Sequence, residues 1–254
     1  MDHLITFHDG TEKTLAFRED KHWYSVDGDY VPSVTTILNV ISKPALMPWA
    51  VKMGADWFEA NYESFSNAEV SVKDMVKGIK GAYRKKSQDA LNIGEEVHAW
   101  CEKAIKFKLG VGSMPELPEN PIVRESIENF RDWTKENDVK WISSEEKLYN
   151  RKYKYAGTVD AVAEVNGAFG VIDFKTSKRL YDEYDLQVSA YGEAVEDMYG
   201  RDCESSWLLR LDKENGSFEA KEIPEGEHAE NFMAFYGALS LYNRLTVLKN
   251  RGKK

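Results

Sequence analysis

The chain has 254 residues, of which 42% are hydrophobic and 30% are charged. That length allows one large domain or two small ones, and the 7 Trp and 13 Tyr argue against a disordered chain. The formal net charge of −9 disfavours a uniformly basic nucleic-acid binder, although a local basic cleft can exist on an acidic protein.

Cysteine usage and hydropathy exclude several further classes. Cys101 and Cys203 are too far apart in sequence for a disulfide framework or a zinc-ligand motif, and two thiolates cannot hold an ordinary iron–sulfur cluster. No signal peptide opens the sequence, and no apolar run approaches the roughly 18 residues that span a bilayer. We therefore expect a cytoplasmic protein with no membrane partner.

The first half of the chain begins with β-rich segments and continues with helices. Asp9-Gly10 and Asp27-Gly28 mark turns between short strands. Pro32-Ser33 before an apolar run indicates a helix start with Ser33 as its N-cap. The expected strands are 4–8, 14–18 and 23–26, and the helices expected from apolar spacing are 49–62, 70–84 and 87–107.

The second half alternates helices and strands. This order is typical of an α/β fold in which helices flank a mixed β-sheet. We expect residues 87–254 to form this core and residues 1–86 to form an N-terminal extension of strands and helices packed on it. The expected segments are helix 121–137, strand 139–149, hairpin 157–175, helix 183–199, hairpin 206–223 and helix 227–249.

The hairpin around the Asn-Gly pair at 166–167 is the most informative segment. Two β-rich runs joined by Asn-Gly predict a type I′ turn, which requires positive φ at both central residues. A tight turn pairs Val165 with Ala168 and brings Asp160 opposite Asp173 as a non-hydrogen-bonded pair. Two like charges in this position repel, so we expect a divalent cation between them, and Asp160→Asn should raise the metal-free stability.

Lys175 shares a face of its strand with Asp173, because side chains alternate along a β-strand. A divalent cation next to a lysine ammonium group is an arrangement that can catalyse the attack of water on a phosphodiester. The cation lowers the pKa of the water, and the lysine stabilises developing charge or orients the nucleophile. The alternative is a solvated hairpin face, which an Asp-x-Lys triplet alone would favour. The opposed Asp160 and the flanking apolar residues favour the cation site.

A histidine and a pair of glutamates are further candidates. His98 lies on an expected helix, with Gly94 and Glu102 on the same face. Its neutral imidazole is a common type of metal ligand, and the alternative is a surface histidine paired with Glu102. Glu145 and Glu146 precede the hairpin on the neighbouring strand. One of the two must face the acidic pair if this strand pairs in register, but the sequence does not decide which.

The helix after the hairpin carries two polar residues at helical spacing, Gln187 and Tyr191. The amide and the hydroxyl can hydrogen-bond a substrate strand, and the ring can stack on a base. The alternative is a partly buried polar pair. Thr176 and Ser177 follow Lys175, and they could bind a phosphate or cap the coming helix.

Four short motifs occur in a fixed order over about 100 residues. They are Gly94 to His98 on a helix, Gly157 to Asp160 and Asp173 to Lys175 on strands, and Gln187 to Tyr191 on a helix. Together these Gly-x-x-x-His, Gly-x-x-Asp, Asp-x-Lys and Gln-x-x-x-Tyr motifs resemble the PD-(D/E)xK nuclease superfamily. The similarity is to the branch that contains RecB-type nuclease domains and phage exonucleases. Residues 32–38 also resemble the opening of phage-encoded members.

The resemblance implies a restriction-endonuclease-like core and a metal-dependent deoxyribonuclease. It implies that Lys175 positions or activates the attacking water, and that Gln187 and Tyr191 contact the substrate strand or brace the site. The chain departs from related groups in lacking four cluster cysteines and the phosphate loop of a helicase motor. The implied ligands of Mg²⁺ or Mn²⁺ are His98, Asp160, Asp173 and the backbone carbonyl of Phe174.

We therefore expect an exonuclease that acts on single-stranded DNA or on duplex ends, in replication, recombination or repair, in a bacterial or phage-infected cell. An oligomer is compatible with the sequence. Two alternatives stay open: a nucleic-acid-binding or protein-binding module that keeps the nuclease fold without turnover, and a metal-dependent phosphatase or nucleotide hydrolase.

Overall fold

The computed structural model describes residues 2–18, 23–67 and 70–251. The chain forms two compact units, a larger one of Met1–Ile41 with Val97–Lys254 and a smaller one of Ser42–Glu96. The N-terminal strands, expected as part of an extension packed on residues 87–254, share a hydrophobic core with the C-terminal region. All the candidate site residues belong to the larger unit.

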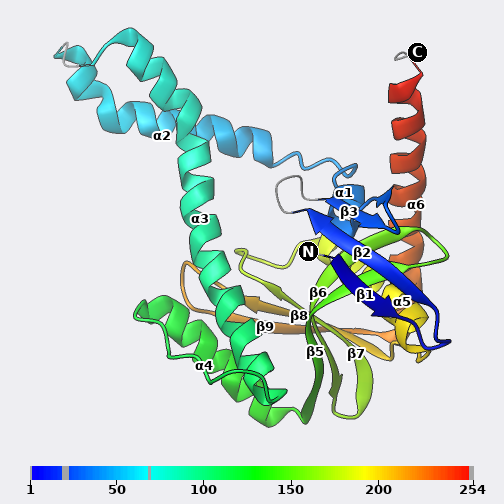
Figure 1. The fold of residues 1–254 in the computed structure, drawn as a ribbon. Coiled ribbons are helices and arrows are strands. Elements are labelled where there is room, and N and C mark those ends of the chain that lie inside the picture. Colours follow the sequence, from blue (N-terminus) through cyan, green and yellow to red (C-terminus); the bar gives the residue numbers. More distant parts are fainter. Residues whose placement is uncertain (1, 19–22, 68–69, 252–254) are drawn as a thin grey trace. The chain divides into compact units, whose positions relative to one another are not determined.

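A five-stranded mixed sheet forms the centre of the larger unit (Figure 1). Its strands lie in sequence order, and neighbours are antiparallel except for β7 and β8, which are parallel. A parallel pair needs a crossover, which α5 provides, whereas a two-residue turn joins the antiparallel strands β6 and β7. The strands are β5 (Val139–Asn150), β6 (Tyr155–Val165), β7 (Ala168–Lys175), β8 (Ser205–Leu211) and β9 (Phe218–Pro224).

Helices cover both faces of this sheet. Val171 of β7 belongs to the core that α5 and α6 cover. On the opposite face, the ring of Phe130 on α4 packs against Phe174 of β7 with 5.3 Å between the ring centroids. Because side chains alternate along β7, Asp173 and Lys175 lie on the α5 face. The helices are α4 (Pro121–Glu136), α5 (Asp182–Tyr199) and α6 (Glu225–Asn250).

A four-stranded antiparallel sheet precedes the first helix, so the expected α/β class with an N-terminal extension is confirmed. The hydroxyl of Tyr24 hydrogen-bonds that of Thr158 at 2.7 Å and links the two sheets. Ser33 caps α1 as expected, because its hydroxyl accepts a hydrogen bond from the Thr36 backbone N–H at 3.1 Å. The elements are β1 (Asp2–Thr6), β2 (Glu12–Arg18), β3 (Trp23–Val26), β4 (Asp29–Val31) and α1 (Val34–Leu38).

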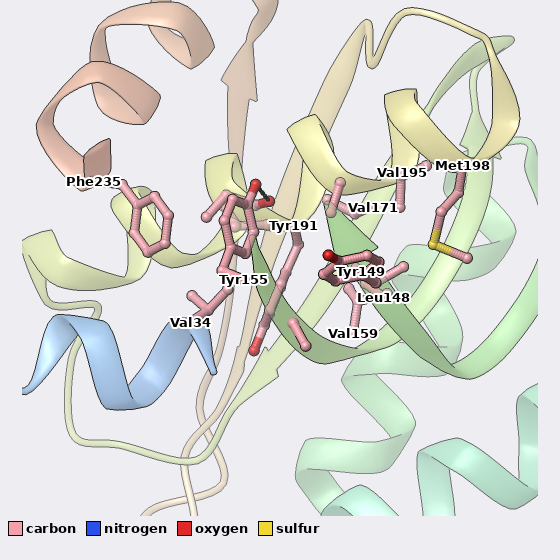
Figure 2. Packing of buried hydrophobic residues seen from close by; sticks show 14 of the residues in the cluster. Val34, Leu148, Tyr149, Tyr155, Val159, Val171, Tyr191, Val195, Met198 and Phe235 are labelled. Atoms are coloured by element: carbon pink, nitrogen blue, oxygen red, sulfur yellow. Dashed lines mark hydrogen bonds between the residues drawn. The ribbon is translucent and has the colours of Figure 1, made fainter. Parts of the chain in front are cut away.

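The core of the larger unit joins α1, α5 and α6 to the start of β6 (Figure 2). Tyr155 is fully buried, and its ring meets that of Phe235 edge-on with 5.0 Å between the centroids. The Tyr155 hydroxyl donates a hydrogen bond to the Ala190 carbonyl at 2.7 Å. Val34 of α1 belongs to the same cluster. Burying each such side chain stabilises the fold by about 1.5–3 kcal/mol, and here it fixes the strand that carries Asp160.

The smaller unit contains α2 (Leu46–Ser66) and most of α3 (Val72–Lys108). The two helices approach closely at glycines, since a Cβ at Gly78 would lie 2.0 Å from the Trp57 ring. One continuous α3 replaces the two helices expected at 70–84 and 87–107, because no Pro or Gly separates them in the sequence. None of the helices in the described part of the chain has the length and apolar character needed to cross a membrane.

Candidate active site

The Asn-Gly hairpin forms with the expected turn and register. Its two central residues have φ values of 53° and 90°, as a type I′ turn requires. Val165 pairs with Ala168, and the ladder continues to Ala161 opposite Ile172. The turn therefore sets the register of the hairpin. The next residue beyond the ladder is Asp160 on β6 and Asp173 on β7, the acids of the Gly-x-x-Asp and Asp-x-Lys motifs.

The two strands separate just beyond that ladder, at Asp160 and Asp173. The expected non-hydrogen-bonded pairing of these two residues is not formed. Asp160 Oδ2 instead accepts a hydrogen bond from the Phe174 backbone N–H at 2.5 Å. The Phe174 N–H thus donates to the Asp160 carboxylate and not to a backbone carbonyl of β6, so the two strands are no longer paired at this point. We call this place, with Asp160 on one arm and Asp173 on the other, the β6–β7 fork.

Asp173 is buried and faces Lys175. Only 4% of Asp173 is exposed, and its Oδ2 atom forms an ion pair with the Lys175 ammonium group. The same oxygen has no well-oriented hydrogen bond, so the contact is electrostatic. The Lys175 side chain is 13% exposed and donates a hydrogen bond to Gln187 Oε1 at 2.9 Å. The lysine thus connects an acid of the fork to α5.

Gln187 and Tyr191 continue this chain of contacts into the protein. The Gln187 amide donates to the Tyr191 hydroxyl at 3.0 Å, and the two residues are 9% and 4% exposed. Gly157 makes room for the ring, since a Cβ there would lie 2.6 Å from Tyr191 Cε1. The two α5 residues therefore brace Lys175 from beneath, and their burial argues against direct contact with a substrate.

His98 approaches the other arm of the fork. Its Nδ1 atom lies 3.4 Å from Asp160 Oδ1, and its side chain is 33% exposed. The alternative pairing with Glu102 does not occur, because Glu102 forms an ion pair with Lys106. Burial by itself lowers the pKa of His98, but the charge and hydrogen bond of Asp160 and the charge of Asp173 together raise it overall.

The two acids of the fork differ in their electrostatic balance. Burial would raise the pKa of Asp160, but the His98 charge and the Phe174 N–H outweigh burial and hold it below its usual value. Burial raises the pKa of Asp173; Lys175 opposes that rise and the Asp160 charge adds to it.

Glu145 is a third acid at the fork, and the sequence left its orientation open. It lies on β5 between two residues that pair with the neighbours of Asp160 on β6. Its φ of 54° is in the left-handed region, which costs energy for a residue with a side chain. Burial and the charges of Asp160 and Glu102 raise the pKa of Glu145 to about 7. Glu146 instead adds its charge to the burial that raises the pKa of Tyr199.

The loop after Lys175 carries Thr176 and Ser177. The Ser177 hydroxyl donates a hydrogen bond to the Arg179 carbonyl at 2.7 Å. Neither residue caps the next helix, because α5 begins at Asp182 with Tyr181 in the N-cap position. Both are half-buried beside Lys175, and a phosphate contact for them stays a prediction.

The negative charge of the fork is suited to a cation, but its side chains in this structure contact other groups and do not surround a common point. Throughout the described residues, no three His, Cys, Asp or Glu side chains converge closely enough to hold a metal ion as they stand. Asp173 turns to Lys175, and Asp160 to His98 and the backbone. The charge of Asp160 nevertheless acts on both Asp173 and Glu145, and Asp173 Oδ2 has no well-oriented hydrogen bond, so these residues fit a cation that would relieve the repulsion.

Comparison with known proteins finds matches among solved structures. No protein-family model and no curated protein matches the chain. One match is the crystal structure of SSO0001, with 17% identity and a TM-score of 0.28, over 43% of this chain and 55% of that one. The alkaline exonuclease LHK-Exo from Laribacter hongkongensis matches with 13% identity and a TM-score of 0.31, over 61% of this chain and 86% of that one. Its complex with dAMP gives 12% identity and the same TM-score. Matches at this level carry no argument about function.

Proposed function

We propose that this chain is a metal-dependent nuclease of the PD-(D/E)xK type. It would act as an exonuclease on single-stranded DNA or duplex ends, in replication, recombination or repair. The observation that carries the proposal is the β6–β7 fork, where Asp160 and Asp173 follow the last paired residues of β6 and β7, Asp173 pairs with Lys175, and the charge of Asp160 acts on Glu145. Acids whose charges repel one another in a buried place destabilise a fold, so their presence at the fork supports a functional role.

Mg²⁺ or Mn²⁺ is the ion that oxygen-rich ligands and a histidine at such a place would hold. When bound, the ion polarises a phosphoryl oxygen and lowers the pKa of water. Asp173 now pairs with Lys175 and His98 with Asp160 Oδ1, so both side chains would have to reorient to hold the ion. The proposed ligands are Asp160, Asp173, Glu145, His98 and the Phe174 carbonyl oxygen.

Lys175 is the side chain best placed to assist hydrolysis. Its ammonium group is shared between Asp173 and the Gln187 amide oxygen. Once the Asp173 carboxylate serves the cation, Lys175 can donate to a phosphate oxygen or orient the attacking water. Gln187, itself held by Tyr191, keeps the ammonium group in place, so both act as positioning residues.

Digestion of end-labelled DNA tests this function. Single-stranded and double-stranded substrates are incubated with Mg²⁺, with Mn²⁺ and with EDTA. We expect progressive loss of nucleotides from the ends with either metal and intact DNA with EDTA. Mononucleotides should release no phosphate, which separates a nuclease from a phosphatase. DNA that stays intact with both metals while it binds the protein would overturn the proposal in favour of a binding module.

A further inference from the structure

A row of aromatic and basic side chains leads away from Lys175 along the loop between β7 and α5. The Lys175 ammonium group lies 4.5 Å from the centroid of the Tyr184 ring. The Tyr184 ring meets the Tyr181 ring edge-on with 5.6 Å between the centroids. The Arg179 guanidinium group lies over the Tyr181 ring, 4.9 Å from its centroid. We call Lys175, Tyr184, Tyr181 and Arg179 the tyrosine row.

The tyrosine row runs from the interior to the surface. The Lys175 side chain is 13% exposed, Tyr184 is half-buried, and Tyr181 is 36% exposed. Tyr181 occupies the N-cap position of α5 but makes no side-chain capping hydrogen bond there. Its side chain is therefore not needed to cap the helix, and the partly exposed ring lies one ring further out from the proposed catalytic lysine than Tyr184.

Arg179 is available for a ligand, in contrast to its neighbour. Lys178 forms an ion pair with Glu214 at 2.9 Å. Arg179 is exposed and, among the residues that the structure describes, contacts the Tyr181 ring without an acidic partner. A guanidinium group over an aromatic ring keeps its N–H donors free at the edge, where they can reach a phosphate.

We propose that the tyrosine row binds an unpaired nucleobase of the substrate strand, stacked on Tyr181, with Arg179 at an adjacent phosphate. This inference rests on the proposed nuclease function, and it specifies single-stranded DNA as the preferred substrate. Aromatic rings stack on every base, so the site would tolerate any sequence. A base inside a duplex has its faces covered by its neighbours, so the tyrosine row favours single strands.

The charges around α5 support a base, rather than a phosphate, at Tyr181. The first turn of α5 contains Asp182, Glu183 and Asp185. Asp185 is paired with Lys221 at 2.6 Å, but the exposed Asp182 would repel a phosphate placed over the helix start. Gln187 and Tyr191 are too buried to supply the stacking surface. Tyr181, the outer ring of the tyrosine row, is the more exposed of its two rings and the one that a strand can reach.

Binding of a fluorescent oligothymidylate, measured by anisotropy in EDTA, tests the inference without cleavage. Tyr181→Ala should weaken binding roughly 5-fold to 150-fold, the range that loss of one stacked base produces. Tyr181→Trp should keep the affinity, because it keeps an aromatic face. Binding of a blunt duplex should change less than twofold in either variant. The control is Tyr236→Ala, which removes a 40% exposed tyrosine from α6 and should leave all affinities unchanged.

A single abasic site moved along the oligothymidylate locates the stacked base. The wild type should lose affinity at one position, and Tyr181→Ala should show no further loss there. A second possible result is that the wild type and Tyr181→Ala bind the single strand equally and both digest DNA in Mn²⁺. That result would contradict base binding by the tyrosine row but not the proposed nuclease function. A wild type that neither binds nor digests DNA would overturn both.

Discussion

Two buried ionic clusters lie side by side on the same sheet, and they differ in how well their charges are matched. Arg210 of β8 pairs with Lys175 of β7 in the parallel ladder. Its guanidinium group donates hydrogen bonds to Glu219 at 2.8 Å, to Asp212 at 2.9 Å and to Ser217 at 3.2 Å. Each charge in the Arg210 cluster therefore has partners, as is typical of an ionic network that supports a fold.

The β6–β7 fork has the opposite character. Asp173 Oδ2 lacks a well-oriented hydrogen bond, and repulsion and burial raise the pKa of Glu145 to about 7. Glu145 also holds a left-handed backbone conformation. The comparison teaches that buried charge alone does not mark a functional site. In the fork, Lys175 and His98 pair with Asp173 and Asp160, yet burial and neighbouring charge still raise the pKa of Glu145, which supports the proposal that the fork binds a ligand.

The largest expected effect is on activity at the fork. Lys175→Ala should lower the rate of DNA digestion about 10²-fold to 10⁴-fold, because it removes the group that we propose to assist the attacking water. Metal binding should persist, since the carboxylates remain. The control is Lys140→Ala, which truncates a lysine whose side chain is 62% exposed on β5 and should digest DNA at the normal rate. Normal digestion by Lys175→Ala would remove this lysine from the mechanism.

The largest effect on stability should come from the well-matched cluster. Arg210→Ala leaves the buried carboxylate of Asp212 without its cation, so the free energy of unfolding should fall by about 3–5 kcal/mol. Urea denaturation measures this loss. A loss below about 1 kcal/mol would mean that the Arg210 cluster does not support the fold, and the contrast with the fork would fail.

Glu145→Gln should stabilise the metal-free protein, in a pH-dependent way. The folded pKa of Glu145, about 7, lies above the usual value of 4.5, so the folded state loses stability as the pH rises from 4.5 through 7. Glutamine avoids that loss. The variant should be more stable than the wild type by on the order of 2 kcal/mol at pH 8, and equally stable near pH 4. Glu146→Gln, at the next position of the same strand, is the control and should leave the stability within about 0.5 kcal/mol of the wild type at pH 8.

Asp160→Asn should have the smallest effect, and of the opposite sign. The sequence alone predicts a gain in stability from relief of repulsion. The structure revises this, because His98 and the Phe174 N–H hold the pKa of Asp160 below its usual value. Losing these charge-assisted contacts should lower the metal-free stability by roughly 1–2 kcal/mol. A higher melting temperature for Asp160→Asn in EDTA would restore the sequence-based view.

The parts of this molecule that follow from local chemistry were predictable from its sequence. The Asn-Gly turn sets the hairpin register, and helical spacing places Gln187 and Tyr191 on one face of α5. Alternation along β7 places Asp173 and Lys175 together. These local rules brought most of the candidate residues to one place, as the distances between their side chains show.

The role of Glu145 was not predictable, because it depends on an irregular pairing. A bulge between Trp141 and Ser143 shifts the register of β5 on β6. No Gly, Pro or turn motif at this place in the sequence predicts the bulge. Without that shift known, either glutamate could face the fork. The burial of Tyr191 and the exposure of Tyr181 likewise depend on how α5 packs on the sheet, which periodicity does not give.

The central claim is that the acids of the β6–β7 fork hold a divalent cation, and the melting temperature in EDTA and in millimolar Mn²⁺ tests it most directly. An ion at 100 times its dissociation constant stabilises the folded state by about 2.7 kcal/mol, so the wild type should melt several degrees higher in Mn²⁺. Asp173→Asn should lose most of this rise, while Arg210→Lys should keep it. A wild type that melts at the same temperature in both solutions, or an Asp173→Asn variant that gains as much as the wild type, would contradict the account.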